Sequence, residues 1–461
     1  MSKKKNKKKN IKPSLPKAQS SVTNQSTSQV RLSQCMIVKN EEKHIERALG
    51  WAKDIAYEQI VVDTGSTDRT VELAKQQGAK VYHFEWINDF SAAKNFAMDK
   101  AEGNWIAILD ADEYMIPEDA EELKNILDKI QSDPATAKQY DAIDNSWAQL
   151  DDNYNIFAVL TNRRVFRNSP ELRYKGKIHE AIWIINKSYD ATHLKIMHTG
   201  YAQSVYNETD KRARNLKLLR DEYERDPKNP NIMIYLADSI KAEGTEEARK
   251  EAEELFLKAI KNDIVADAPI KQLAYDFLIP RFSRNEQITG GISKKDEALK
   301  LCDQAITDLP ENIDYYYFRA ILNNQKGNFE SARDDLTVCE RAFTKGESIP
   351  ATRVLLSNPM SLFFQQKIAA KGTGDEQGLL KSTTVLNSML NEAKTNISKT
   401  GSYILNILLY GLTEDEALDE FAGVHDFNDP KELMFLARAA KESGAISFSR
   451  RVLNIVEALM K

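Results

Sequence analysis

The chain has 461 residues, of which 42% are hydrophobic and 29% are charged, and its formal net charge is -5. This length and composition can build several hydrophobic cores, so two or three folded units are expected, and the mildly acidic balance gives no reason to expect a nucleic-acid partner. The sequence has no run of 18 apolar residues, so no membrane span is expected. Its three cysteines, Cys35, Cys302 and Cys339, have no metal-ligand spacing and are predicted to be reduced core residues of a cytoplasmic protein.

The first 30 residues form a basic tail that differs from the rest of the chain. They contain eight lysines, no acidic residue and no aromatic residue. Such a segment cannot bury enough apolar surface to fold, so residues 1–30 are predicted to be disordered. No apolar stretch follows the lysines, so a secretory signal is not expected. The tail is interpreted as a solubilising leader, and weak electrostatic contact with an anionic membrane surface or RNA is the alternative.

From residue 34 to residue 113 the sequence alternates short apolar runs with amphipathic stretches. Strands are predicted at 35–38, 59–63, 80–86 and 105–109. Helices are predicted between them, around 45–49, up to about residue 77, and around 92–95. This alternation predicts an α/β domain with a largely parallel, doubly wound sheet. The carboxyl ends of its strands form the edge where a nucleotide is expected to bind.

Two carboxylates follow the most apolar of these strands. Trp105–Leu109 has the composition of a strand covered on both faces, and Asp110 and Asp112 come directly after it. In an extended chain residues i and i+2 point the same way, so both carboxylates can face one cation while Ala111 lets the backbone come close. The pattern predicts a Mg²⁺ or Mn²⁺ site completed by substrate phosphates. The alternative is a solvated acidic turn.

Four motifs in this order resemble the family-2 type of inverting glycosyltransferase, which has the A-type nucleotide-diphospho-sugar fold. They are CMIVKNE at 35–41, VDTGSTD at 62–68, DFSAAKN at 89–95 and LDADE at 109–113. The resemblance covers about residues 31–205 and implies that donor-binding residues lie at the strand ends. Those residues are Val38, Asn40, Glu41, Asp63, Ser66, Lys94, Asn95, Asp110, Ala111 and Arg164.

The resemblance also assigns parts to individual residues. Asn40, Glu41 and Asp63 are expected around the nucleoside, although Asp63 could equally be a helix cap at a strand end. Asp110 and Asp112 are expected to meet the metal and the diphosphate. Lys94 stands where the family more often has Arg, so it keeps the charge but loses the planar, two-pronged phosphate contact.

Residues 162–180 are predicted to form a hairpin that flanks the site, with Asn162–Arg167 as one arm and Tyr174–Glu180 as the other. Arg163, Arg164 and Lys177 could stabilise the diphosphate as it leaves, or they could be solvated cations on the hairpin surface. The first arm places three arginines around the apolar pair Val165 and Phe166.

The general base is expected in the second arm. An inverting transfer needs one group on the acceptor side that takes the acceptor proton, and Glu180 is the first candidate. His179 could do the same or orient Glu180. His198 ends a later apolar strand, where it is either a packing residue or, as in other A-type folds, a metal ligand beside Asp112.

The hairpin also resembles, more closely, the sublancin S-glycosyltransferase subgroup, whose type enzyme modifies a cysteine of a bacteriocin peptide. The residues that carry this likeness are RRVFR at 163–167, GKIHE at 176–180 and HTGY at 198–201. It implies a hexose donor, such as UDP-glucose, and a Ser, Thr or Cys acceptor. A cell-surface polysaccharide or lipid-linked sugar is the alternative acceptor, and a non-catalytic scaffold with a decayed transferase domain is the alternative class.

Residues 206–461 are predicted to be a helical linker followed by tetratricopeptide-like repeats. The repeat spacing is clearest in Tyr317–Ala320, Gly327, Phe329, Ala332, Leu336 and Cys339. Copies are predicted around Leu236–Ala259 and Leu436–Val456, whereas Thr344–Thr400 is helical but shows no phase. Stacked helix pairs commonly hold extended peptides, so a peptide or protein acceptor is expected to bind this domain. Self-association into a homo-oligomer, or simple buttressing, is the alternative.

Overall fold

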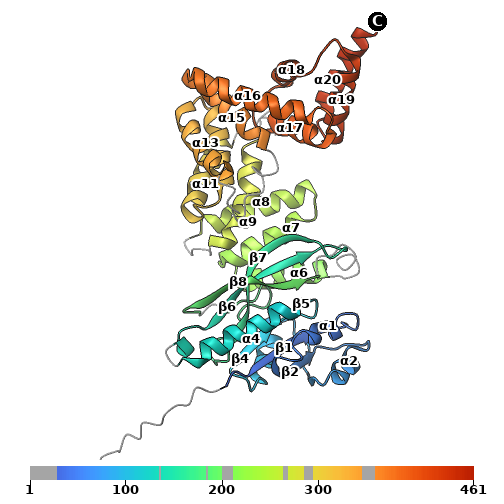
Figure 1. The fold of residues 1–461 in the computed structure, drawn as a ribbon, viewed down its shortest axis with the longest axis vertical. Coiled ribbons are helices and arrows are strands. Elements are labelled where there is room, and N and C mark those ends of the chain that lie inside the picture. The colour runs from blue at the N-terminus through green and yellow to red at the C-terminus, as the bar shows by residue number, and fades with distance from the viewer. Residues whose placement is uncertain are drawn as a thin grey trace, which may run out of the picture. The chain divides into compact units, whose positions relative to one another are not determined.

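The computed structural model describes residues 29–133, 136–182, 185–199, 211–262, 268–284, 294–344 and 359–461. These residues form two compact units, Met1–Arg214 and Asn215–Lys461 (Figure 1). The predicted tail falls almost entirely on residues 1–28, which lie outside the described residues, and so does the predicted domain boundary between residues 205 and 206.

The first unit is built on one eight-stranded sheet with the order β3-β2-β1-β4-β7-β6-β8-β5. Its strands are β1 (Leu32–Val38), β2 (Ala56–Asp63), β3 (Lys80–His83), β4 (Trp105–Ile108), β5 (Glu113–Met115), β6 (Ala142–Leu150), β7 (Ile156–Arg167) and β8 (Ser188–His198). β1 pairs in parallel with β2 and β4, and β2 pairs in parallel with β3. The four predicted strands and the parallel half of the sheet are therefore confirmed.

The other half of the sheet is mixed, which the sequence did not predict. β7 runs antiparallel to both β4 and β6, β6 is parallel to β8, and β5 is antiparallel to β8. The hairpin predicted between residues 162 and 180 is wrong. The first arm belongs to the long strand β7, whose hairpin partner is β6, and the second arm is a loop with one isolated bridge between Lys175 and Ala181.

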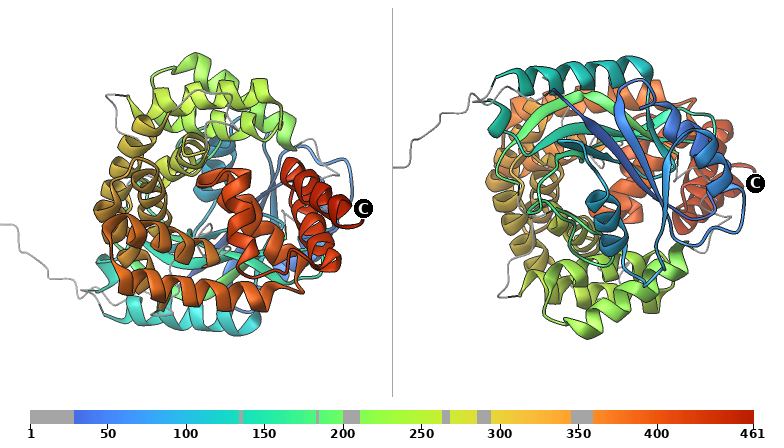
Figure 2. Two further views of the ribbon diagram at one scale, coloured as in Figure 1. Left: turned by 90° about the horizontal axis from the view of Figure 1, so that it is seen from above. Right: turned by 90° about the horizontal axis from the view of Figure 1, so that it is seen from below.

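Four α-helices cover this sheet: α1 (Ile45–Gly50), α2 (Thr70–Gln76), α3 (Phe90–Asp99) and α4 (Pro117–Ser132). Alternate residues of β4 enter different cores. Trp105 packs in a cluster with Leu123 of α4, whereas Ile106 packs in a cluster with Met98 of α3. β4 is therefore buried on both faces, as predicted, and Figure 2 shows α4 along one face of the sheet. Asp89 caps α3 by accepting the N–H of Ala92.

The described residues of the second unit that have regular structure are all helical, which confirms an α/β domain followed by an all-α region. The helices are α6 (Lys211–Arg225, which begins in the first unit), α7 (Pro230–Lys241), α8 (Glu246–Ile260), α9 (Ala268–Phe282), α11 (Lys295–Asp308), α12 (Ile313–Gln325), α13 (Phe329–Thr344), α15 (Pro359–Thr373), α16 (Glu376–Ala393), α17 (Ile397–Tyr410), α18 (Glu414–Ala422), α19 (Pro430–Glu442) and α20 (Ile446–Leu459).

The three predicted repeat copies correspond to the pairs α7/α8, α12/α13 and α19/α20 (Figure 1). The stretch that sequence could not phase contains a further pair, α15/α16. Arg319 of α12 ties neighbouring helices together, because its guanidinium contacts Asp303 of α11 and Asp335 of α13 at 2.7 Å each. The three cysteines are free and buried, as predicted. None of the helices in the described ranges has both the length and the apolar character that crossing a membrane requires.

The close approach of α17 and α19 gives a test of the repeat packing. Gly401 lies inside α17, where an added Cβ would stand 2.4 Å from the carbonyl oxygen of Ala439. Gly401→Ala is expected to lower the free energy of unfolding by about 1–3 kcal/mol, because the two helices must separate to admit the methyl group.

Gly423, at the end of α18, is the matched control for this prediction. The nearest atom to an added Cβ there is 3.7 Å away, an ordinary contact distance. Gly423→Ala is expected to change the free energy of unfolding by no more than about 0.5 kcal/mol. Urea unfolding followed by far-ultraviolet circular dichroism measures both variants, and equal midpoints would contradict the close helix contact.

Candidate active site

The ends of β1 and β2 meet in one turn network at the carboxyl edge of the sheet. Asn40 follows β1 and has a φ of 58°, in the left-handed region that Asn tolerates better than most residues. Its N–H donates to Ser66 Oγ at 3.0 Å, and its Oδ1 accepts the N–H of Thr67 at 2.8 Å. The N–H of Glu41 donates to Thr70 Oγ1 at 2.7 Å. The structure therefore brings the predicted residues Asn40, Glu41 and Ser66 into one place.

Asp63 ends β2 in the same network. Its Oδ1 accepts the N–H of Ser66 at 2.9 Å, and His83 Nδ1 lies 3.4 Å from its Oδ2. Burial would raise the pKa of Asp63, but the hydrogen bonds from Ser66, the turn backbone and His83 outweigh burial and hold the pKa below its ordinary value. The carbonyl of Val38 accepts both the N–H and the hydroxyl of Thr64. This edge is thus fixed by hydrogen bonds and carries an ionised carboxylate.

A chain of alternating charges crosses the site from β5 to the loop after β7. The Glu113 carboxylate lies 2.6 Å from Arg164 Nη2, which is 3.2 Å from Asp110 Oδ2. Lys94 Nζ lies 3.2 Å from Asp110 Oδ1 and 2.8 Å from Glu180 Oε1. Each cation therefore bridges two carboxylates, and Asp110 stands in the middle of the chain.

The pKa values follow from burial and these neighbours. Burial alone would lower the pKa of Lys94, but Asp110 and Glu180 raise it above its ordinary value. Burial would raise the pKa of Asp110, yet Lys94 and Arg164 hold it well below the ordinary range. For Glu113, burial prevails over Arg164 and the pKa is raised. Lys94, Asp110 and Arg164, the middle members of this series of ion pairs, therefore stay charged at neutral pH.

Glu113 and the contacts of Lys94 were not foreseen from the sequence. Glu113 is fully buried, and its Oε2 accepts the N–H of Asp110 at 2.9 Å, so it fixes the turn that carries Asp110. Its sequence signals are its place at the end of the motif at 109–113 and at the start of the apolar run Tyr114–Ile116. Lys94 is 3% exposed, and its observed partners are two carboxylates, so it links Asp110 to Glu180.

The loop that presents Glu180 is held by α3. The Asn95 amide exchanges two hydrogen bonds with the backbone of Tyr174, at 2.8 and 2.9 Å. Ser91 Oγ donates to the carbonyl of Gly176 at 2.5 Å. These contacts of Asn95 are those of a residue that positions the loop. Glu180 is 13% exposed and faces Lys94, whereas the neighbouring His179 is exposed.

Gly176 and His179 shape this loop through their backbones. Gly176 has a φ of 93°, a value that residues with a side chain rarely adopt. His179 has a φ of 52°, in the left-handed region. A non-glycine residue in this region costs backbone energy that the surrounding contacts must offset, and such residues cluster at functional sites. In this turn Glu180 lies beside Lys94 and His179 is exposed.

Asp112 and His198 meet because β5 pairs with β8. Glu113 lies opposite His198 in that ladder, and Asp112 Oδ2 lies 3.6 Å from His198 Nε2. His198 Nδ1 is 2.6 Å from Gln149 Oε1. The Gln149 side chain therefore holds the imidazole ring with Nε2 on the side of Asp112. A carboxylate and an oriented imidazole fit a divalent cation, and Ala111 is buried beside them.

Asp110 does not share this arrangement. Both of its oxygens are bound by cations, Lys94 on one side and Arg164 on the other. In the parts of the chain that the structure describes, no three His, Cys, Asp or Glu side chains are grouped as a metal site. The predicted metal set is therefore brought together only in part, as Asp112 with His198.

Arg47 is a further residue that the sequence did not single out. Its Nη2 donates to Thr199 Oγ1 at 3.3 Å, and Thr199 donates its N–H and its hydroxyl to the carbonyl of Asp112, both at 3.1 Å. The Arg47 guanidinium also lies over the Tyr114 ring, 4.6 Å from its centroid. Arg47 thus holds the backbone between Asp112 and the end of β8.

Of the three arginines near the end of β7, Arg164 is the one that contacts Asp110 and Glu113 in the site. Arg163 pairs with Asp144 and is half-exposed. Arg167 lies over the Trp105 ring, 4.6 Å from its centroid, and donates to the carbonyl of Tyr140. The register of β7 against β6 shifts between Val165 and Arg163, so Arg164 stands outside the regular pairing and is separated from its neighbours.

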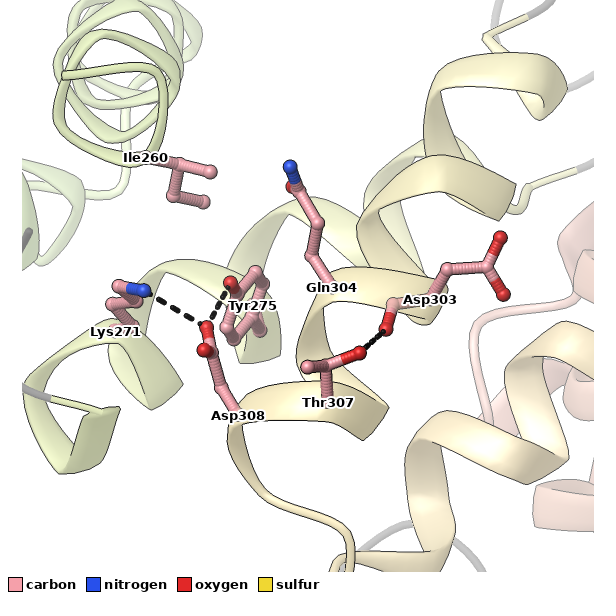
Figure 3. Close-up of a pocket in the computed structure, with 7 residues that line it drawn as sticks. All are labelled: Ile260, Lys271, Tyr275, Asp303, Gln304, Thr307 and Asp308. Atoms are coloured by element: carbon pink, nitrogen blue, oxygen red, sulfur yellow. Dashed lines mark hydrogen bonds and ion pairs between the residues drawn. The ribbon is translucent and has the colours of Figure 1, made fainter. Parts of the chain in front are cut away.

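The helical unit contains a hollow of about 360 Å³, lined by Ile260, Lys271, Tyr275, Asp303, Gln304, Thr307 and Asp308. In Figure 3 Lys271 and Tyr275 converge on Asp308, whose Oδ2 accepts from both, at 3.0 and 2.7 Å. These polar groups satisfy one another. The hollow therefore shows no cluster of unpaired groups that would carry chemistry, unlike the carboxylate-lined edge of the sheet.

Comparison with known proteins identifies the first unit. Residues 33–190 match the Glycosyl transferase family 2 model. Over 232 residues the chain is 29% identical to the SPbeta prophage-derived glycosyltransferase SunS of Bacillus subtilis, which covers 49% of this chain and 52% of that protein. Over 154 residues it is 38% identical to a TPR repeat-containing protein of Synechococcus elongatus, which covers 33% of this chain and 35% of that protein.

The chain thus spans about half or less of the length of these two relatives. Among solved structures, S. aureus TarS 1-349 in complex with UDP-GlcNAc aligns at 13% identity and a TM-score of 0.33, covering 68% of this chain and 92% of that chain. The family match begins in β1, ends in β8 and includes the turns that carry Asn40, Asp63 and Asp110. The chain therefore contains a glycosyltransferase family 2 domain, which spans residues 33–190.

Proposed function

We propose that this chain is an inverting, metal-dependent glycosyltransferase that moves a hexose from a UDP-sugar onto a Ser, Thr or Cys side chain of a peptide or protein. The observation that carries the proposal is the ion-pair link from Asp110 through Lys94 to Glu180, with 3.2 and 2.8 Å between the paired atoms. This link fixes a carboxylate on the acceptor side relative to the donor edge, which in-line transfer with inversion requires.

On the donor side, Asn40, Glu41 and Asp63 surround the nucleoside. The turn network already fixes the groups of these residues that it bonds, so little conformational entropy is lost when the donor binds. Asp112 and His198 hold the divalent cation, with Asp110 nearby. When bound, Mg²⁺ or Mn²⁺ supplies positive charge to the departing diphosphate. Arg164 contributes a buried positive charge close to the same position.

On the acceptor side, Glu180 takes the proton of the attacking group. Lys94 binds its Oε1, and among the described residues no hydrogen bond to its Oε2 is present, so this oxygen can face the acceptor. Glu180 is favoured over His179 as the base because Lys94 fixes its carboxylate, whereas His179 is exposed. A Cys acceptor needs less help than a Ser or Thr acceptor, because a thiol with a pKa of about 8.5 is already partly ionised near neutral pH.

A peptide acceptor is supported by two features. The likeness to SunS extends over 232 residues and so beyond the family 2 domain itself. The second unit consists of helix pairs, which are suited to extended peptides. A sugar on a polysaccharide or lipid is the second candidate for the acceptor. A screen of UDP- and GDP-sugars with Mg²⁺ or Mn²⁺ tests the peptide acceptor. It measures nucleotide release first and then the intact mass of candidate peptides, which increases only if a peptide is the acceptor.

The first prediction concerns the metal site. Asp112→Ala is expected to lower transfer roughly 100-fold or more, because the cation that offsets the diphosphate charge is lost. EDTA is expected to do the same to the unchanged protein, and added Mn²⁺ or Mg²⁺ to restore it. Asp128→Ala, on the exposed face of α4, is the control for surface charge. Full turnover in Asp112→Ala with an unchanged melting temperature would contradict metal-dependent transfer.

The second prediction concerns the base. Glu180→Gln keeps the shape and loses the proton acceptor, so kcat for a Ser peptide is expected to fall by roughly two to four orders of magnitude. The donor Kd is expected to change little, which calorimetry with UDP measures. For the matched Cys peptide the loss is expected to be smaller. Glu171→Gln, at an exposed position, is the control. Near-normal turnover of the Ser peptide would move the role to another group.

The third prediction concerns the repeats. A chain that ends at Asn229 keeps α6 and removes α7 and all later helices. It is expected to retain hydrolysis of the donor but to lose transfer to the peptide, because the acceptor platform is gone. Deletion of residues 1–28 is expected to leave both activities unchanged. If the shortened chain glycosylates the same peptide with an unchanged KM, the repeats do not bind the acceptor.

A further inference from the structure

β7 has one edge that is paired only near its end. β6 pairs with β7 from Ile156 to Phe166 on one side. On the other side β4 pairs with Val165, Phe166 and Arg167 only. Over residues 156–164, this second edge has no strand partner among the described residues, although the strand itself is continuous (Figure 1). Its backbone N–H and C=O groups are therefore available to another extended segment.

This edge lacks charged side chains and proline, two of the features that usually protect an unpaired strand. Ile156, Phe157, Val159 and Leu160 are 43%, 60%, 50% and 46% exposed. No charged residue and no proline occurs between residues 156 and 162. Proteins usually place lysine or proline at such an edge to prevent pairing with other chains. The register of β7 against β6 shifts at Phe157 and at Arg164, and the strand between these two positions pairs regularly. This regular, apolar and exposed stretch without charge or proline fits a surface that binds an extended partner.

The edge leads directly to the proposed site. β4 pairs with β7 up to Ala107 opposite Val165, and the chain then turns at Asp110. A segment added to the edge would lie about 4.8 Å from β7. It would occupy the position that β4 would take if β4 continued along β7. One end of that segment would therefore lie beside Arg164 and Asp110, which are 3.2 Å apart. Its other end would extend along β7 past Leu160, about 13 Å further on.

We propose that residues 156–163 of β7 bind the acceptor peptide as an added β-strand, so that the modified side chain lies at the Asp110 end. This inference rests on the proposed function and specifies how its acceptor is held. Backbone hydrogen bonds hold the part of the peptide next to the site while the repeats hold the rest, and the exposed apolar side chains favour peptides with apolar residues at alternate positions. A polysaccharide or lipid-linked sugar has no backbone amides to pair with this edge, so the surface fits a peptide.

The experiment begins with a displayed library of twelve-residue peptides that have a central Cys or Ser. The library is selected on the full-length protein in the presence of UDP, and the enriched peptides are synthesised with a fluorescent label. Binding is measured by anisotropy. Strand pairing uses the amides of alternate residues, so N-methylation of one alternate set is expected to weaken binding at least tenfold and methylation of the other set to have little effect.

A set of matched variants compares a lysine placed on the β7 edge with a lysine placed on a helix of the second unit. Val159→Lys and Phe157→Lys change exposed positions, so the fold is expected to be kept, and both are expected to weaken peptide binding at least tenfold. Leu380→Lys, at a position that is 70% exposed in α16, is the control and is expected to bind the peptides normally. Hydrolysis of the donor is expected to be the same in all three variants, because none touches the donor edge.

Several results would overturn the inference. These are the failure to enrich any peptide, equal effects of the two N-methylated sets, and normal peptide binding by both edge variants. An edge that instead pairs with a second copy of the chain would show in light scattering as a dimer that Val159→Lys dissociates. If peptides bind through the edge but receive no sugar, the inference stands and the proposed function fails. If peptides are glycosylated with the same KM by the edge variants, the proposed function stands and the inference fails.

Discussion

The charge chain Glu113, Arg164, Asp110, Lys94 and Glu180 is the interaction on which the rest of the site depends. Its members come from β5, β7, the turn after β4, α3 and the loop after β7, so it joins five separate segments. Buried charges are tolerated only when each has a partner of opposite sign. Loss of either cation would leave buried carboxylates unpaired, and the segments that carry them would then have to separate or take up protons.

This constraint explains why the loop that carries Glu180 is as well fixed as the turns at the strand ends. The loop of residues 174–182 has little regular structure, yet α3 holds it through Asn95 and Ser91, and Lys94 of the same helix holds Glu180. One helix therefore sets both the loop and its carboxylate. Lys94 also contacts Asp110. A shift of α3 would therefore move Asp110 and Glu180 together and preserve the distance between them.

The sequence could predict what is encoded locally. The strand ends at Asp63 and Asp110 and the helix pair around Ala320 were found because apolar periodicity and small crossing residues lie within a few residues of each other. The partners of Lys94 could not be predicted, because Glu180 lies far along the chain. The hairpin error has the same origin, since β6 carries Asp144, Asn145 and Ser146 within its run and its pairing with β7 is set by the whole sheet.

The position of Lys94 also shows why its substitution by arginine would not be conservative here. An ammonium group is a compact charge whose donors can point at two carboxylates from different directions, as it does toward Asp110 and Glu180. A guanidinium is larger and presents its donors in one plane. In a site where Lys94 is 3% exposed, the added volume would cost about 1–3 kcal/mol unless the loop moved outward. Because that loop carries Glu180, an arginine that fits would alter the acceptor side.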